Sequence, residues 1–159
     1  MSQEVEVVLT QRGRDKLEQR LDYLRNVQRR AVAERIRDSK QFGDLSENAE
    51  YEDAKTEQAL VESQILEVRR ILQVAQVLDP NDIPTDRVGI GSIVKMMNLD
   101  NDEEWEFTLV NSAEADPDNE LISDESPVGE ALYGKKPGDT AEIHIPDGIL
   151  RYRIEGIRK

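Results

Sequence analysis

The chain of 159 residues has no cysteine and a single histidine, His144. Without cysteine it can form neither a disulfide framework nor a thiolate metal site, and one histidine cannot supply a pair of imidazole ligands. No apolar run approaches the length of a membrane span, and the chain begins with the polar and acidic residues Met-Ser-Gln-Glu. We therefore expect a cytoplasmic protein with no membrane partner.

Aromatic residues are also scarce, at 4% of the chain, whereas charged residues make up 35%. This balance suits exposed helical surface better than a large aromatic core, and it argues against an aromatic prolyl-isomerase pocket. The formal net charge of −13 argues against a protein that simply coats nucleic acid, because such a protein needs a basic surface.

Proline is absent before Pro80, and the preceding residues carry two long helical patterns. Each pattern has an apolar stripe at steps of three and four residues, which is typical of a coiled-coil seam. The first helix is expected to begin after an N-cap at Thr10, and the second to end at Asp79-Pro80. The first stripe comprises Leu17, Leu21, Leu24, Ala31, Val32 and Ile36, weakened by the interior positions Gln28 and Arg35, and the second comprises Ala54, Gln58, Val61, Ile65, Val68, Leu72 and Ala75.

The charges of these two segments favour an antiparallel pairing. Residues 12–40 carry 10 basic and 5 acidic side chains, whereas residues 44–67 carry 8 acids and only Lys55 as a base. Opposite charges beside the seam stabilise a coiled coil, so the two segments are expected to form a helical hairpin.

The second half changes its period after a linker at residues 80–88, which contains two prolines. Alternating apolar residues predict strands at 93–97, 105–110, 141–145 and 149–157, with a further short strand at 120–123. Ser126-Pro127 is a strong helix start, an N-cap followed by proline at the first helical position. The expected fold is α+β: an antiparallel coiled-coil hairpin at residues 1–79, then a small antiparallel sheet with one helix at residues 89–159.

The turn of the hairpin carries the stretch Gly-Asp-Leu-Ser-Glu-Asn-Ala-Glu-Tyr, from Gly43 to Tyr51. Asp44 and Glu47 are three residues apart, so both carboxylates lie on one side of the first helical turn. Capping alone explains this spacing, because Asp44 as N-cap with Glu47 three residues on is a variant of the capping box. The alternative is chemistry, since burial cannot explain so polar a turn at the end of so long a hairpin.

The whole stretch, followed by Ala54-Lys55 and Glu57-Gln58, resembles the signature of the bacterial Gre transcript cleavage factors. Leu45-Ser46 together with Ala54-Lys55 favours the GreA branch of that family over GreB. The resemblance continues through residues 122–132 and Gly134-Lys135, so it covers nearly the whole chain. It implies a transcription elongation factor whose second domain resembles the FK506-binding-protein fold.

The resemblance further implies that the hairpin tip enters the secondary channel of bacterial RNA polymerase and stimulates the polymerase's own hydrolysis of backtracked RNA. Asp44 and Glu47 would then help to hold Mg²⁺ and the attacking water. Two exposed carboxylates cannot hold Mg²⁺ tightly alone, so this ion would be shared with the polymerase and the factor would be no enzyme by itself.

Arg37, Lys40 and Lys55 would contact the 3′ end of the backtracked nascent RNA. The alternative is that the lysines are solvated or paired with Glu52 or Glu57. Tyr51 is expected to pack against the first helix rather than stack on a base.

Glu125, Ser126 and Pro127 match the family's polymerase-docking segment. Helix capping explains Ser126 and Pro127 but leaves Glu125 unexplained, and the neighbouring Asp124 is a second candidate for the docking carboxylate. We expect a monomer. Two rival functions are an inhibitory paralogue that enters the same channel, and a peptide-binding or isomerase module with a coiled-coil arm.

Overall fold

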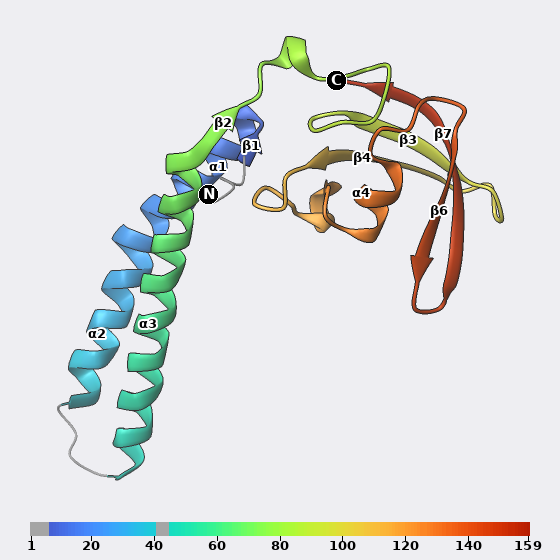
Figure 1. The fold of residues 1–159 in the computed structure, drawn as a ribbon. Helices are drawn as coiled ribbons and strands as arrows, with labels where there is room; N and C mark the ends of the chain where they lie inside the picture. The colour runs from blue at the N-terminus through green and yellow to red at the C-terminus, as the bar shows by residue number, and fades with distance from the viewer. Residues whose placement is uncertain (1–6, 41–44) are drawn as a thin grey trace, which may run out of the picture. The chain divides into compact units, whose positions relative to one another are not determined.

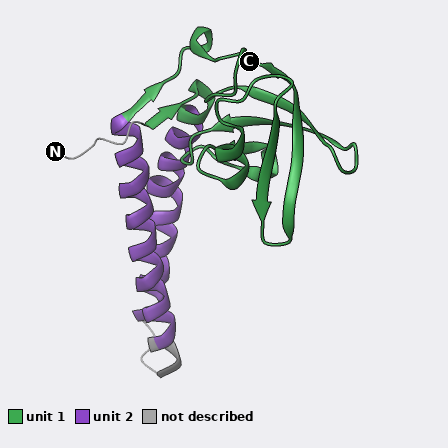
Figure 2. Ribbon diagram, turned by 45° about the vertical axis from the view of Figure 1, so that its right-hand side comes forward, with its two compact units in different colours: residues 1–14, 75–159 green, residues 15–74 purple. Residues whose placement is uncertain are grey.

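The computed structural model describes residues 7–40 and 45–159, without the side chains of residues 45–48. The chain divides into two compact units, one of residues 15–74 and one of residues 1–14 and 75–159 (Figure 2). Among the described residues, no helix is long and apolar enough to cross a membrane.

The unit of residues 15–74 is the predicted helical hairpin. Its first arm runs through α1 (Gln11–Tyr23), a π-helical turn η1 (Leu24–Gln28) and α2 (Arg29–Lys40). Its second arm is α3 (Leu45–Val74), which returns alongside the first (Figure 1). The predicted N-cap at Thr10 is confirmed, because its hydroxyl oxygen accepts a hydrogen bond from the Gly13 N–H at 3.0 Å.

A single apolar seam holds the two arms together, and most of the predicted stripe is confirmed. Ala31 departs from it, because it is exposed whereas Val32 is only 2% exposed. The seam is buried at Leu24, Val32, Ile36, Ala54, Val61, Ile65 and Val68, and Leu17, Leu21, Tyr51 and Leu72 pack against it.

The π turn explains why the stripe shifts by one residue. The Arg29 N–H donates to the Leu24 carbonyl, five residues back, so η1 holds one residue more than an α-turn. Each seam residue after η1 therefore falls one position later in the sequence than it would in an uninterrupted α-helix. Arg35, predicted as an interior position, lies outside instead and forms ion pairs with Glu57 and Glu50 of the other arm.

Charge pairing across the hairpin agrees with the predicted antiparallel arrangement. Arg29 forms a two-pronged ion pair with Glu62, with nitrogen–oxygen distances of 2.7 and 2.9 Å. This hydrogen-bonded pair lowers the pKa of Glu62 and raises that of Arg29.

The second arm ends earlier than the sequence indicated. Asp79-Pro80 was predicted to end the helix, but α3 stops at Val74 and β2 (Ala75–Val77) pairs in parallel with β1 (Val7–Leu9). The Leu78 N–H also donates to the Leu9 carbonyl at 2.8 Å. Because β1, which is distant in the sequence, pairs with these backbone groups, they are not available for another turn of α3.

The larger part of the other unit is a five-stranded sheet in the order β5-β4-β3-β7-β6, with one short helix, α4 (Pro127–Leu132), against it (Figure 1). The predicted strands are confirmed as β3 (Ile93–Asn98), β4 (Glu104–Val110), β5 (Leu121–Ser123), β6 (Thr140–Ile145) and β7 (Gly148–Arg158). The core between sheet and helix is formed by Val88, Val94, Met96, Phe107, Leu109, Ile122, Leu132, Ala141 and Ile154.

One strand pair corrects the prediction of a purely antiparallel sheet. β5 lies parallel to β4, with Thr108 opposite Leu121 and Val110 opposite Ser123. The connection passes through the 3-10 turn η3 (Pro117–Asn119) and brings the chain back only as far as Thr108, so β5 pairs with the last three residues of β4. A tight hairpin turn would have reversed the strand, whereas this longer connection does not.

The segment before the sheet is held by specific contacts. It begins with the 3-10 turn η2 (Pro80–Asp82), which Asp79 caps by accepting from the Asn81 N–H at 2.9 Å. The buried Ser92 hydroxyl donates to the Pro84 carbonyl at 2.8 Å and accepts from the Gly89 N–H at 3.1 Å.

Candidate functional site

The acidic turn lies at the edge of what the structure describes. Asp44 lies outside the described residues, and Glu47 is in the first turn of α3 with its side chain outside them. Among the described residues, no group of three or more carboxylates or histidines is placed to hold a metal ion. The pairing of Asp44 and Glu47 therefore stays a prediction from their spacing.

Lys40 and Tyr51 meet where the two arms approach this turn. Lys40 is at the end of α2, and its Nζ lies 5.9 Å from the centre of the Tyr51 ring, near the outer limit of a cation–π contact. The Tyr51 ring is half-buried and packs against the apolar seam. The prediction that Tyr51 packs against the first helix is confirmed.

Lys55 and Arg37 are exposed on opposite arms. The alternative of a solvated Lys55 agrees with its exposure, whereas Glu57 forms its ion pair with Arg35 of the other arm. Lys55 instead lies 3.3 Å from the amide oxygen of Gln58. Within the described part of the chain, no ion pair joins Arg37, Lys40 or Lys55 to a carboxylate.

A second candidate surface begins at the start of α4. Ser126 is the N-cap: its hydroxyl accepts from the Gly129 N–H at 3.1 Å and donates to the Ser123 carbonyl at 2.6 Å. Pro127 follows at the first helical position and is exposed, as is Glu125. The predicted helix start is confirmed, and it presents Glu125 and Pro127 to solvent.

Gly129 is a structural residue of this surface that the sequence analysis missed. A Cβ at this position would lie 2.8 Å from the Asp124 Cα and closer still to the Ser123 carbonyl oxygen. Only glycine allows α4 to lie so near that backbone. The two residues that follow the proline, Val128 and Gly129, gave no distinct signal in the sequence.

Asp124 and Glu125 differ in environment although they are adjacent. One carboxylate oxygen of Asp124 is buried and has no hydrogen-bond partner in the described structure. Burial, and next the nearby charge of Glu125, raise the pKa of Asp124. Glu125 is exposed, so its carboxylate is the more accessible of the two.

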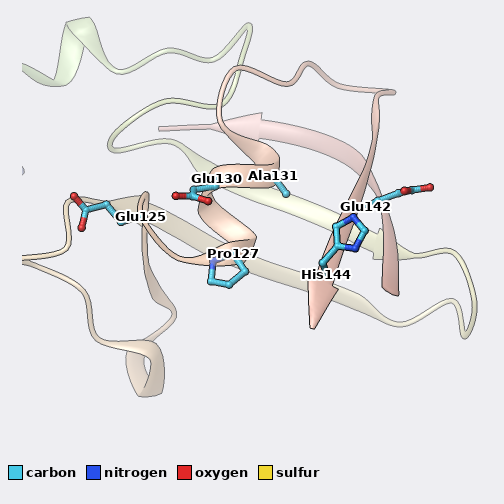
Figure 3. A pocket seen from close by; sticks show the side chains of 6 residues that line it. All are labelled: Glu125, Pro127, Glu130, Ala131, Glu142 and His144. Atoms are coloured by element: carbon cyan, nitrogen blue, oxygen red, sulfur yellow. The ribbon is translucent and has the colours of Figure 1, made fainter. Parts of the chain in front are cut away.

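An open hollow of about 460 Å³ lies beside this helix start. Figure 3 shows Pro127, Glu130 and Ala131 coming from α4, with Glu142 and His144 from β6. Glu142 lies 3.8 Å from Arg151, whereas Glu125 and Glu130 have no cationic partner among the described residues. The lining of the hollow is therefore mainly acidic, with Pro127 and Ala131 as its apolar residues.

His144 is exposed and lines this hollow. The six residues that line the hollow include no aromatic side chain apart from this imidazole. Trp105, Phe107 and Tyr152 pack together elsewhere, with ring centres 4.9 and 6.3 Å from that of Trp105. The hollow thus lacks the aromatic walls that a prolyl-isomerase pocket would need.

Both halves of the chain match family models. Residues 7–77 match the model described as transcription elongation factor, N-terminal, and residues 83–159 match that described as transcription elongation factor, GreA/GreB, C-terminal. The chain is 52% identical to transcription elongation factor GreA of Clostridium kluyveri over 152 residues, covering 96% of each chain. It is 51% identical to GreA of Acetivibrio thermocellus over 159 residues, covering 100% of both.

Solved structures of similar proteins include GreA factor homolog 1 of Thermus thermophilus. The identity to that protein is 29%, the TM-score is 0.45, and the match covers 98% of this chain and 100% of the other.

Proposed function

Because the chain belongs to the GreA/GreB family of transcription elongation factors, we propose that it binds bacterial RNA polymerase and stimulates hydrolysis of backtracked RNA. The match of both halves to the family, with the Gly43 to Tyr51 signature kept at the hairpin turn, carries this proposal. The polymerase performs the reaction in its own active site in the cytoplasm, and the factor, acting as a monomer, donates groups to it.

The acids of the turn act through a shared Mg²⁺ site. Carboxylate oxygens suit Mg²⁺, which keeps several waters and commonly takes only one or two carboxylates from a protein, so Asp44 and Glu47 fit as a partial ligand set. When bound, the ion stabilises the charge that develops on the reacting oxygens of the phosphodiester. Asp44 helps to hold the ion, and Glu47 holds or orients the attacking water.

Three cations on the two arms of the hairpin hold the RNA. Arg37 and Lys40 on α2 and Lys55 on α3 lack carboxylate partners among the described residues, which supports a role in binding phosphate. Contacts of this kind position the 3′ end of the nascent RNA without reading its sequence.

The sheet domain docks on the polymerase. In this proposal residues 89–159 form a domain with a fold like that of FK506-binding proteins, joined by the linker at 80–88 to the hairpin of residues 1–79. Glu125, Ser126 and Pro127 form the docking segment, with Ser126 fixing the helix start and Glu125 making the polar contact. The open position of Glu125 and the buried oxygen of Asp124 support this division.

Cleavage of RNA in stalled polymerase complexes tests the proposal. Asp44→Asn and Glu47→Gln keep the size of each side chain, and Asn still caps a helix. Each should lower stimulated cleavage at least about tenfold, as loss of a group that supports a metal site does. Competition for the polymerase should be unchanged.

The matched controls are Asp53→Asn and Glu52→Gln, which remove the same charges from exposed positions further along α3. Both should cleave like the wild type. Full cleavage by Asp44→Asn and Glu47→Gln would show that the acids only cap the helix, and RNA hydrolysis by the factor without polymerase would contradict the shared site.

A further inference from the structure

Glu114 reaches across the unit of residues 1–14 and 75–159 to the start of α1. One carboxylate oxygen accepts a hydrogen bond from the Thr10 backbone N–H at 3.1 Å, and the other accepts from the Thr10 hydroxyl. The Thr10 hydroxyl oxygen accepts in turn from the Gly13 N–H. The N-cap of the first hairpin helix is thus itself held by a residue 104 positions away in sequence.

Gly13 makes room for this carboxylate. It is the only buried residue of α1, and a Cβ on it would lie 2.5 and 2.6 Å from the two Glu114 oxygens. Glycine within a helix is otherwise unfavourable relative to alanine, because it loses more conformational freedom on folding. The contact with Glu114 therefore gives a physical reason for the glycine.

Both partners of the contact are held in place by their own surroundings. Thr10 follows Leu9, which is fully buried and bonded through its carbonyl to the Leu78 N–H. Glu114 lies in a turn between β4 and η3, where the Asn111 side chain accepts from the Ala113 N–H at 2.9 Å and the Asn111 carbonyl accepts from the Glu114 N–H at 2.9 Å. Thr10 and the turn that carries Glu114 are already ordered by these other bonds. Forming the contact therefore costs little conformational entropy.

The charge of Glu114 also suits this place. A carboxylate at the start of a helix interacts favourably with the exposed N–H groups and the helix dipole. Its hydrogen bonds from the Thr10 N–H and O–H are charge-assisted, which makes them stronger than neutral ones. The contact is therefore expected to persist in solution.

We infer that Thr10, Gly13 and Glu114 form a latch that holds the start of the first hairpin helix to the sheet domain, and that Glu114 is a positioning residue for transcript cleavage. The second part rests on the proposed function. Docking through the sheet domain raises the effective concentration of the hairpin turn at the polymerase active site. All three latch residues lie in the unit of residues 1–14 and 75–159, and α1 continues from Gly13 into the first arm of the hairpin, so the latch holds the residues from which that arm begins.

Hydrogen exchange of backbone amides in the isolated full chain tests the latch without any polymerase. Glu114→Ala removes the acceptor, and Gly13→Ala places a methyl group where the carboxylate lies. Each should lower protection of the amides at positions 10 and 13 by about tenfold, as expected for loss of a hydrogen bond to a charged group.

Gly13→Ala gives the sharper result, because the latch and an ordinary helical position predict opposite changes in amide protection. If position 13 were only a helical residue, alanine would stabilise the helix and raise protection of these amides. The latch predicts lower protection. In the double variant the second change should add almost nothing, since the latch is already broken, and Asp118→Ala, an exposed acid in η3 close to the same turn, should leave both amides unchanged.

Cleavage in stalled complexes tests the positioning role. Glu114→Ala should compete for polymerase like the wild type but cleave several-fold more slowly at saturating factor, whereas Asp118→Ala should cleave normally. Unchanged protection in both single variants, or fully additive loss in the double variant, would overturn the latch. Lost protection with normal cleavage would overturn the positioning role alone, and a wild-type factor that fails to stimulate cleavage would overturn the proposed function but not the latch.

Discussion

The hairpin and the sheet domain are stabilised in different ways. In the hairpin, one line of seam residues is buried along arms whose outer faces carry exposed ion pairs such as Arg29–Glu62. In the sheet domain, residues from α4 and the strands form one buried cluster, in which Phe107 is 1% exposed. The hairpin therefore depends on keeping its apolar residues in register, whereas the sheet domain depends on filling a closed core.

The register of the hairpin should be the most sensitive feature, and single deletions test it. Removing Glu67 would reduce the step from Ile65 to Val68 to two residues and rotate the rest of α3 by about 100°. Each apolar side chain turned out of the seam should cost about 1.5–3 kcal/mol of unfolding free energy. We expect the helical circular dichroism signal to be lost at much lower urea concentration.

Deletion of Asn26, an exposed residue in η1, is the matched control. It should turn the π turn into an ordinary α-turn and leave Leu24 and Val32 both in the seam, with little loss of stability. Equal destabilisation by the two deletions would show that η1 does not set the register.

The core of the sheet domain should respond next most strongly. Phe107→Ala should lower the unfolding free energy by about 3–5 kcal/mol, the usual cost of emptying a buried phenylalanine site. The single tryptophan, Trp105, reports this transition by fluorescence, because its ring lies 4.9 Å from that of Phe107.

If the hairpin and the sheet domain are stabilised separately, Phe107→Ala should lower the urea midpoint of the tryptophan signal more than that of the helical signal. Leu66→Ala, on an exposed position of α3, should leave both signals nearly unchanged. Equal shifts of both signals in Phe107→Ala would mean that hairpin and sheet domain unfold as one cooperative unit.

Asp124 should give the smallest effect, and one that depends on pH. Burial and the charge of Glu125 raise its pKa in the folded state, so its ionised form opposes folding at neutral pH and stability rises as the pH falls through that pKa. Asp124→Asn should therefore unfold at slightly higher urea than the wild type at pH 7, and this gain should shrink as the pH falls through the raised pKa.

Glu125→Gln provides the comparison for Asp124→Asn. It removes only the second cause of the raised pKa, so it should give a smaller gain of the same sign. A pH-independent difference for Asp124→Asn would contradict the assignment of the effect to this carboxyl group.

Patterns that repeat along the chain predicted most of the fold. The five strands of the sheet domain, the Thr10 and Ser126 caps and most of the seam were identified correctly, because alternation, three- and four-residue steps and capping are local properties. The short strands β1 and β2 were not predicted. The π turn was missed because Leu24 to Gln28 contain no proline or glycine that would mark an irregular turn. Ala31 was therefore placed in the seam, and Arg35 at an interior position.

At the candidate sites, the residue types could be identified from the sequence but their partners could not. The signature from Gly43 to Tyr51 singled out Asp44 and Glu47, whose side chains lie outside the described residues. The structure decided that Glu57 pairs with Arg35 rather than Lys55, and that Asp124 has a buried oxygen whereas Glu125 is open.

The sequence by itself determined the helical hairpin, its complementary charges and the strands of the second domain, because each follows from residues that are close along the chain. Only the tertiary structure decided the parallel pairings of β1 with β2 and of β4 with β5, and the contact of Glu114 with Thr10. Such contacts form only after a long loop has closed, and the free energy of that closure depends on the whole fold rather than on any local pattern.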